Sequence, residues 1–363
     1  MKRRQKIPKV RIAVVGAGLA GQRHIDIAAH SSKAQLSAIV DPALASEIGQ
    51  VHGAPVYESL TELFAKDRPD GVVLATPNKL HLSQALECIA AGIPTLVEKP
   101  LADTLEAGVR LCEAAEAANV PILVGHHRRH SVIMDKAVEL IQSGVLGRIV
   151  AVTGYFLLYK SQNEGYYAGA HAWRTEPGGG PILINMIHEV DNLRALCGEI
   201  VAVQAFTSNA IRGFPVEDTA AIAFRFASGA LGTFILSDAA ASDHSWEHTA
   251  GEDHVFDPAH SEDADCYHLA GTMGSLSIPT MRLRCYPSAA DQSWHKPLEP
   301  STIEIEIVDP LVRQMEHFAE VILGKAQPLV TARDGLQSLR VIDAIFEAAR
   351  TGRTVSTTIS NET

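Results

Sequence analysis

The chain has 363 residues, of which 46 % are hydrophobic and 20 % charged, and its formal net charge is -11. This length exceeds one ordinary core and predicts two domains. The acidic balance argues against a nucleic-acid partner, since nucleic acids attract basic patches. The apolar run at 10–16 is only strand-length, and no run approaches the ~20 apolar residues that span a bilayer. We therefore expect neither a signal peptide nor a membrane partner.

The cysteine usage bears on compartment and metal content. The 5 cysteines are scattered and show no CxxC spacing. This pattern argues against a disulfide framework and against a structural zinc site. We expect a cytoplasmic protein with no bound metal.

Strand and helix signals alternate over the first 125 residues. The predicted strands are 10–15, 34–40, 71–75, 94–97 and 121–124, and the predicted helices are 19–30, 80–90 and 105–118. Strands separated by helix-length segments indicate parallel βαβ units. The fold class expected here is α/β, with an N-terminal Rossmann doubly wound parallel sheet over residues 1–127.

The pattern changes in residues 128–363. Helices are predicted at 131–143 and 182–196, and apolar residues at helical spacing predict two more at 311–322 and 336–346. The predicted strands are 149–158, 201–207, 219–226, 230–237, 275–278, 281–286 and 303–308. Strand runs without intervening helices indicate a C-terminal α+β domain with a mainly antiparallel sheet, and the closing helices could pack back on the first domain.

Residues 241–264 form a distinct segment that is rich in His, Asp and Glu. Loops of this length are often lids or disordered segments. His244 and His248 are four residues apart, but no Glu follows His244, so the HExxH pattern of a metal site is absent. A substrate lid, a solvated loop and a metal site stay open, in that order of preference.

A glycine-rich turn follows the first predicted strand, where residues 16–21 read GAGLAG. In this context Gly16 permits a tight turn, Gly18 lets the backbone approach a pyrophosphate, and Gly21 lets the helix pack on the sheet. The cofactor contacts predicted at this turn are Gly16, Gly18, Leu19 and Ala20.

Asp41 ends the second predicted strand, 20 residues after Gly21. A carboxylate at this place can accept the ribose hydroxyls of NAD and repels the 2′-phosphate of NADP. No Arg or Lys is among the next residues, 42–44. We therefore expect NAD as the cofactor rather than NADP.

Several motifs, in order along nearly the whole chain, resemble the Gfo/Idh/MocA family of oxidoreductases, the glucose-fructose oxidoreductase and inositol dehydrogenase group. They are ATPN at 75–78 with His81, EKP at 98–100, GHHRR at 125–129, Trp173-Arg174 before GGG at 178–180, GTMGS at 271–275, and the closing segment 314–352. The resemblance implies a Rossmann domain, an open-faced sheet domain whose exposed face forms a homodimer or homotetramer, and NAD(P)-dependent oxidation or reduction of sugars, polyols or dihydrodiols. It extends the expected cofactor site to Thr76, Asn78, His81, Glu98, Lys99, His127, Trp173 and Arg174, of which Arg174 could instead serve the substrate.

Two residues are predicted to carry the proton chemistry. Lys99 follows a strand end at the ligand-binding edge of a parallel sheet, where an ammonium can polarise a carbonyl or lower the pKa of a hydroxyl. His188 can exchange a proton near neutral pH. The alternatives are a solvated surface lysine and a core histidine. Ile184, Asn185, His188, Asp191 and Asn192 would share one face of the predicted helix.

Sugar and inositol dehydrogenases of this family often carry an Asp four residues before that His, and this chain has Ile184. The substrate contacts predicted are therefore Lys99, Asn185, His188, Arg128 and Tyr155. Arg128 and Arg129 could bind a substrate carboxylate or pair with carboxylates at the domain junction.

The leading hypothesis is an NAD-dependent dehydrogenase or reductase acting on a secondary alcohol or ketone of a sugar, sugar lactone or cyclic polyol. Alternatives are a dehydrogenase of a carboxylated cyclic dihydrodiol, and a non-redox enzyme or sensor that keeps NAD tightly bound.

Overall fold

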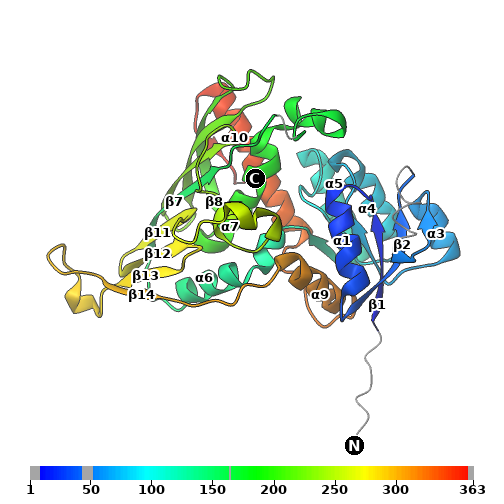
Figure 1. Cartoon of the computed structure of the whole chain (residues 1–363), viewed down its shortest axis with the longest axis horizontal. Helices are drawn as coiled ribbons and strands as arrows, with labels where there is room; N and C mark the ends of the chain where they lie inside the picture. The colour runs from blue at the N-terminus through cyan, green and yellow to red at the C-terminus, as the bar shows by residue number, and fades with distance from the viewer. Residues whose placement is uncertain (1–8, 43–51, 163–164, 359–363) are drawn as a thin grey trace, which may run out of the picture. The chain divides into compact units, whose positions relative to one another are not determined.

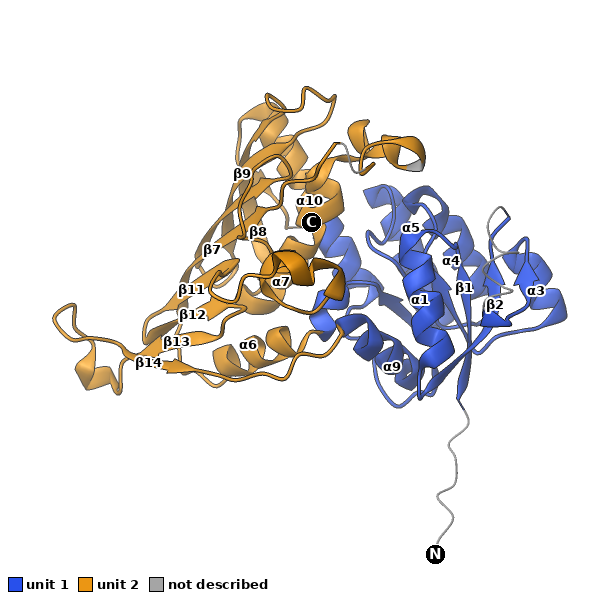
Figure 2. Ribbon diagram, viewed as in Figure 1, with its two compact units in different colours: residues 1–130, 310–339 blue, residues 131–309, 340–363 orange. Residues whose placement is uncertain are grey.

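A computed structural model describes residues 9–42, 52–162 and 165–358. The chain divides into two compact units, shown in Figure 2. Unit 1 takes the chain up to His130 and then 310–339, and unit 2 takes 131–309 and the chain from Arg340 onward. Among the described helices, none is long and apolar enough to cross a membrane. The domain division at 127/128 stays a prediction.

Unit 1 is built on a six-stranded parallel sheet in the order β3-β2-β1-β4-β5-β6. Its strands are β1 (Val10–Val15), β2 (Ala34–Val40), β3 (Val56–Tyr57), β4 (Gly71–Leu74), β5 (Thr95–Val97) and β6 (Ile122–Val124). Its helices are α1 (Leu19–His30), α3 (Leu60–Lys66), α4 (His81–Ala90), α5 (Leu105–Ala118), α9 (Pro310–Ile322) and the start of α10 (Ala332–Thr351). The predicted Rossmann sheet is confirmed.

Helices cover both faces of this sheet because successive strand residues point to opposite sides. Ile12 and Val14 of β1 pack in one core with residues of α1 and α9. Ala13 and Val15 pack in a second core with residues of α3, α4 and α5. The carboxyl ends of the strands meet at one edge, which therefore carries the loops that follow β1, β2, β4, β5 and β6.

Unit 2 is built on a nine-stranded sheet in the order β14-β13-β12-β11-β7-β10-β9-β8-β15. The strands are β7 (Ile149–Leu157), β8 (Ile200–Ser208), β9 (Thr219–Phe226), β10 (Leu231–Ser237), β11 (Tyr267–Gly271), β12 (Gly274–Ile278), β13 (Arg282–Cys285), β14 (Glu299–Thr302) and β15 (Val355–Ser356). Among the described strands of this second sheet, only β7 and β10 pair in parallel, so the expected mainly antiparallel sheet is confirmed.

The two faces of this sheet differ in what covers them. In β10, Gly232, Phe234 and Leu236 are buried while Leu231, Thr233 and Ile235 are exposed. The helices α6 (Val132–Gln142) and α7 (Ile187–Cys197) lie on one side of the sheet in Figure 1. The alternation of buried and exposed residues therefore marks one helix-covered face and one open face.

The predicted helix at 182–196 is present but is not α-helical throughout. Residues Ile182–Met186 form a π-helix, η4, and α7 begins at Ile187. A π-helix bonds each N–H one residue further back than an α-helix, so the spacing that placed Ile184 and His188 on one α-helical face does not apply. The single-helix prediction is therefore wrong for the part that carries Ile184 and Asn185.

Other differences are confined to short elements. The strand predicted at 303–308 is absent, and β14 ends at Thr302. The short elements β3, α3, β11 and β15 were not predicted from the sequence. Two-residue strands such as β3 and β15 have too few residues to show a period.

Candidate functional site

The glycine turn after β1 has the geometry of a nucleotide-binding loop. Gly16 has φ +90°, and a side chain there would meet the Ala75 carbonyl oxygen at 2.7 Å. A Cβ on Gly21 would lie 1.9 Å from the Gly16 oxygen, whereas one on Gly18 would meet nothing within 4 Å. Gly16 and Gly21 are thus required by packing, while Gly18 stands in open space. Leu19 and Ala20, which begin α1, are exposed, so the helix N-terminus can reach an anionic ligand.

Asp41 follows β2 directly and is tied to this turn. Its Oδ2 accepts a hydrogen bond of 2.8 Å from the Ala17 backbone N–H. Asp41 therefore fixes the loop and places a carboxylate beside it, as the sequence predicted. Ala43 and Leu44, part of the argument against NADP, lie outside the described residues.

Glu98 and Lys99 follow β5 at the same edge. The Glu98 carboxylate lies 2.8 Å from Nε2 of the buried His24 on α1, and its other oxygen accepts the Lys99 backbone N–H at 3.1 Å. Burial raises the pKa of Glu98, but the His24 hydrogen bond, with the charges of His24, Lys99 and His127, lowers it to about 2. Glu98 is thus a fixed anion, while Lys99 is half-buried.

His24 was missed by the sequence reasoning. A Cβ on Gly125, after β6, would lie 3.0 Å from Glu98 atoms, so this glycine makes room for the His24–Glu98 pair. The sequence did contain a signal for this pair, namely a histidine in the helix after the glycine-rich turn together with the glutamate of the EKP motif.

His81 lies within unit 1 rather than at its surface. The side chain is fully buried, with Nδ1 2.9 Å from the Pro100 oxygen and Nε2 2.9 Å from the Thr76 oxygen. Burial lowers the pKa of His81. The ring therefore joins the loops after β4 and β5. Thr76 itself donates to Gln84 at 2.6 Å, and Asn78 is half-buried at the start of η1 (Asn78–Leu80).

The GHHRR segment forms the 3-10 turn η2 (His127–His130) after β6. Burial lowers the pKa of His127 to about 3, and the charge of Arg128 adds to this effect, so the imidazole stays neutral near pH 7. The Arg128 side chain is buried, while Arg129 is partly exposed.

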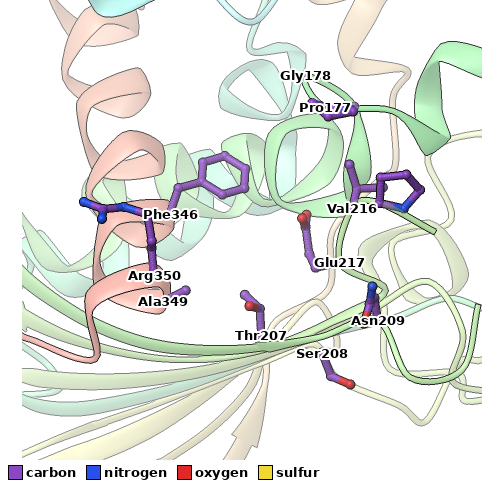
Figure 3. Close-up of a pocket in the computed structure, with 12 residues that line it drawn as sticks. Pro177, Gly178, Thr207, Ser208, Asn209, Val216, Glu217, Phe346, Ala349 and Arg350 are labelled. Carbon is purple, nitrogen blue, oxygen red and sulfur yellow. The ribbon is translucent and has the colours of Figure 1, made fainter. Parts of the chain in front are cut away.

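In unit 2, a glutamate far along the chain caps the start of η4. Glu217 Oε1 accepts the Ile182 backbone N–H at 2.8 Å, and a Cβ on Gly180 would lie 2.7 Å from this same oxygen. Glu217 lines a pocket of about 600 Å³ together with Phe346 and Arg350 of α10 (Figure 3). Burial raises the pKa of Glu217 to about 7, against the Ile182 hydrogen bond. Gly180 of the GGG motif thus admits the carboxylate that holds the segment leading to His188.

The polar residues of α7 divide between roles. His188 is buried at the first turn. Asn192 Nδ2 donates at 3.1 Å to the hydroxyl of Tyr267 on β11, and that hydroxyl donates to Glu189. Asn192 therefore faces the sheet. His188 lies four residues before it in the same α-helix, whereas Asn185 lies in the π-helical turn, outside the regular α-helical spacing.

Asn185 has a partner that the sequence reasoning missed. Its Oδ1 accepts a 2.7 Å hydrogen bond from Lys160 Nζ, just beyond β7. Arg174, in the turn η3 (Gly169–Thr175), stacks within the same region on Tyr166, with its Cζ 4.0 Å from the ring centroid. Trp173 is 47 % exposed.

Tyr155 lies on the opposite face of the sheet from this group. It pairs in register with the exposed Ile235, whereas the next residue, Phe156, is buried and has Lys160 Nζ 5.4 Å from its ring centroid. The Tyr155 ring instead lies 5.5 Å from that of His244. Tyr155 therefore lies on the open face of the sheet, because side chains of a strand alternate between faces, and its contact with a substrate stays a prediction.

The His-rich segment 241–264 is folded against unit 2. It contains α8 (Trp246–Thr249) and η5 (His254–Ala259). Trp246 is buried, and its Nε1 donates to Glu252 at 2.9 Å. No group of three His, Cys, Asp or Glu among the described residues could hold a metal ion. The buried tryptophan favours a structured insertion over a solvated loop.

Comparison with known proteins agrees with this architecture. Residues 10–126 match the model of the Gfo/Idh/MocA oxidoreductase family with an NAD-binding Rossmann fold, and residues 134–277 match its C-terminal domain. The rhizopine catabolism protein MocA of Rhizobium meliloti is 26 % identical over 346 residues, 93 % of this chain and 95 % of that protein. The 1,5-anhydro-D-fructose reductase of Ensifer adhaerens is 30 % identical over 308 residues, 81 % of this chain and 82 % of the reductase.

A solved structure extends the similarity. The WlbA dehydrogenase of Bordetella pertussis, in complex with NADH and UDP-GlcNAcA, is 26 % identical and superposes with a TM-score of 0.74 over 97 % of this chain and 100 % of that one. The fold, the glycine turn and these relatives define an NAD-binding oxidoreductase. The chain belongs to the Gfo/Idh/MocA family.

Proposed function

We propose that this enzyme transfers a hydride between NAD and a secondary alcohol or ketone of a small cyclic polar substrate, a sugar, sugar lactone or polyol. The observation that carries the proposal is the fixed Glu98 beside Lys99 at the edge that holds the glycine turn and Asp41. When bound, NAD supplies the hydride acceptor in oxidation, or the donor as NADH in reduction. Relatives named for sugars and inositol support the substrate class.

The chain's residues have separate roles in this proposal. Gly16, Gly18 and the first amides of α1 hold the pyrophosphate, and Asp41 accepts the ribose hydroxyls, which favours NAD over NADP. The contacts of Thr76, Asn78, His127 and Trp173 with the cofactor stay proposals. His81 and Glu98 act as positioning residues, because both are held by other parts of unit 1.

Two residues carry the proton. Lys99 places a positive charge on the substrate oxygen, which lowers the pKa of an alcohol and polarises a ketone. In oxidation the hydroxyl proton passes to His188 while the hydride leaves the same carbon. In reduction His188 returns the proton to the oxygen.

The test is Lys99→Met, which keeps the length of the side chain and removes its charge. NADH formation on a panel of sugars, inositols and dihydrodiols should fall by about 10³-fold, while calorimetry still detects NAD binding. Lys66→Met, on the exposed face of α3, is the control. Undiminished turnover by Lys99→Met would remove Lys99 from the mechanism.

A further inference from the structure

A cluster of hydrogen-bond donors in unit 2 surrounds the ring of Tyr166. Lys160 Nζ lies 2.8 Å from the Tyr166 hydroxyl oxygen and 4.5 Å from the ring centroid. The Arg174 guanidinium lies 4.0 Å from the same centroid, and its Nη1 donates to the Tyr166 backbone oxygen at 3.0 Å. Asn185, one residue after Ile184, completes the cluster through its 2.7 Å bond from Lys160. All four side chains are only partly buried, so a ligand can reach them.

The cluster offers donors and few acceptors. An ammonium has three N–H donors, and within the described chain Lys160 uses two of them, on Tyr166 and Asn185. Lysine can only donate, so the Asn185 carbonyl faces it and the Asn185 amino group is turned elsewhere. Burial raises the pKa of Tyr166 to about 12, so its hydroxyl keeps a proton to give. Arg174 Nε is buried and finds no acceptor among the described residues.

Charged groups of both signs surround Lys160. Asp238 and Glu247 raise the pKa of Lys160, and Arg174 and Arg212 lower it. Asp238 is already engaged, because Arg212 Nε lies 2.8 Å from its Oδ1 and Tyr167 donates to its Oδ2 at 2.5 Å. The Asp238 carboxylate is therefore shared with Arg212 and Tyr167, and among the described residues no ion pair joins a carboxylate to Lys160 or to Arg174.

A partly buried cation without a full counter-charge is costly, and an anion relieves that cost. Burial is the first cause that lowers the pKa of Lys160, to about 8, against the two carboxylates. A neutral hydroxyl would both donate and accept here, whereas a carboxylate only accepts and so matches a set of donors.

We propose that Lys160 and Arg174, held on the Tyr166 ring beside Asn185, bind a carboxylate of the substrate, so that the enzyme acts on a sugar-derived acid. The inference rests on the proposed function, because it names the substrate class of the same reaction. The proposal also accounts for Ile184. If the substrate brings its own carboxylate close to Asn185, an Asp at position 184 would add a second negative charge there and would not favour binding.

The first experiment measures binding without turnover. The full-length protein is treated at about pH 8 with an amine-acylating reagent, and the modification of each lysine is read by mass spectrometry. We expect D-glucuronate, D-galacturonate or D-gluconate to protect Lys160, and the neutral partners D-glucose, D-galactose and D-glucitol to leave it reactive. Lys136, paired with Glu139 on the surface of α6, is the internal reference.

The second experiment measures selectivity. Lys160→Met should raise the KM for the protecting acid by about 10- to 100-fold, the loss of one charged hydrogen bond, and change the KM for its neutral partner by less than about twofold. Lys160→Arg should recover part of the preference, because it restores the charge. Lys136→Met is the matched control, and thermal unfolding confirms that each variant is folded.

The outcomes separate the two proposals. Protection of Lys160 by an acid in the Lys99→Met variant, which lacks turnover, supports the carboxylate site on its own. Protection without NADH formation from any compound would contradict the proposed oxidation and leave the carboxylate site supported. Equal protection by acids and neutral sugars, or none by any acid, would overturn the carboxylate site.

Discussion

Asp41 is the residue on which the proposed preference for NAD over NADP depends. It holds the Ala17 amide and supplies the carboxylate that would meet the ribose. In Asp41→Ala we expect the KM for NAD to rise about tenfold or more, and the KM for NADP to change much less, because the 2′-phosphate no longer meets a negative charge. Initial rates with both cofactors measure this.

Asp103→Ala, an exposed position before α5, serves as the control for Asp41. Asp41→Asn keeps an oxygen that can accept the Ala17 N–H but has no charge. This variant therefore distinguishes the effect of losing the loop contact from the effect of losing the charge. An unchanged ratio of the two KM values in Asp41→Ala would remove Asp41 from the ribose site.

At single positions, the sequence was informative where a motif constrained the backbone. Gly16, Asp41 and Glu98 lie where the motifs predicted, because a φ of +90° and close packing admit few alternatives. Lys160 was missed because its partner Asn185 is far along the chain and no motif joins them. Tyr155 was expected at the substrate although the strand pattern alone does not say which of its two faces meets the helices.

Among the elements, η4 gives a prediction about pH. Burial raises the pKa of Glu217 from its ordinary 4.5 to about 7. Between these values the folded protein holds a proton that the unfolded chain lacks. The resulting stabilisation is complete below about pH 4.5 and is lost as the pH rises through 7. Glu217→Gln cannot lose this proton and should lack the effect.

Calorimetry from pH 5 to 8 measures this difference. The Tm of the wild type should fall relative to that of Glu217→Gln by several degrees, which corresponds to about 2 kcal/mol. The wild type and the variant must be compared at each pH, because other groups also titrate. Burial lowers the pKa values of His127 and His130 to about 3, so these two residues make the folded protein more stable as the pH rises. Glu176→Gln, at an exposed position between η3 and η4, is the control. Parallel curves would mean that Glu217 does not titrate in this window.

Long elements with a clear period were predicted closely, and irregular ones were not. The ranges of β1, α1, β2 and α5 match the sequence prediction residue for residue. The π-helix could not be predicted, because its apolar residues fit an α-helical period equally well. Residues 303–308 alternate like a strand but form none, although the Ile303 N–H donates to the Met281 oxygen at 3.3 Å. Strand pairing depends on a neighbour that sequence alone does not supply.

At the scale of the whole molecule, the open face of the nine-stranded sheet is the main surface without an explanation inside the chain. Leu231 is 58 % exposed and Phe206 is 71 % exposed. Ile235 follows Leu231 by four residues on β10 and points to the same face. Exposed apolar residues on a flat sheet face mark an interaction surface. We propose that a second copy of this chain covers it, as the family resemblance implies.

A charge placed on that face tests the assembly. In Leu231→Lys combined with Ile235→Lys, two ammonium groups would have to be buried without partners, so the oligomer should dissociate. Light scattering with size-exclusion chromatography should give a dimer or tetramer mass for the wild type and a monomer mass for the variant. Leu323→Lys, an exposed leucine of unit 1, should keep the wild-type mass. A wild type that is monomeric, or a variant that keeps its assembly while folded, would place the interface elsewhere, and the exposed face of β10 would then need another partner.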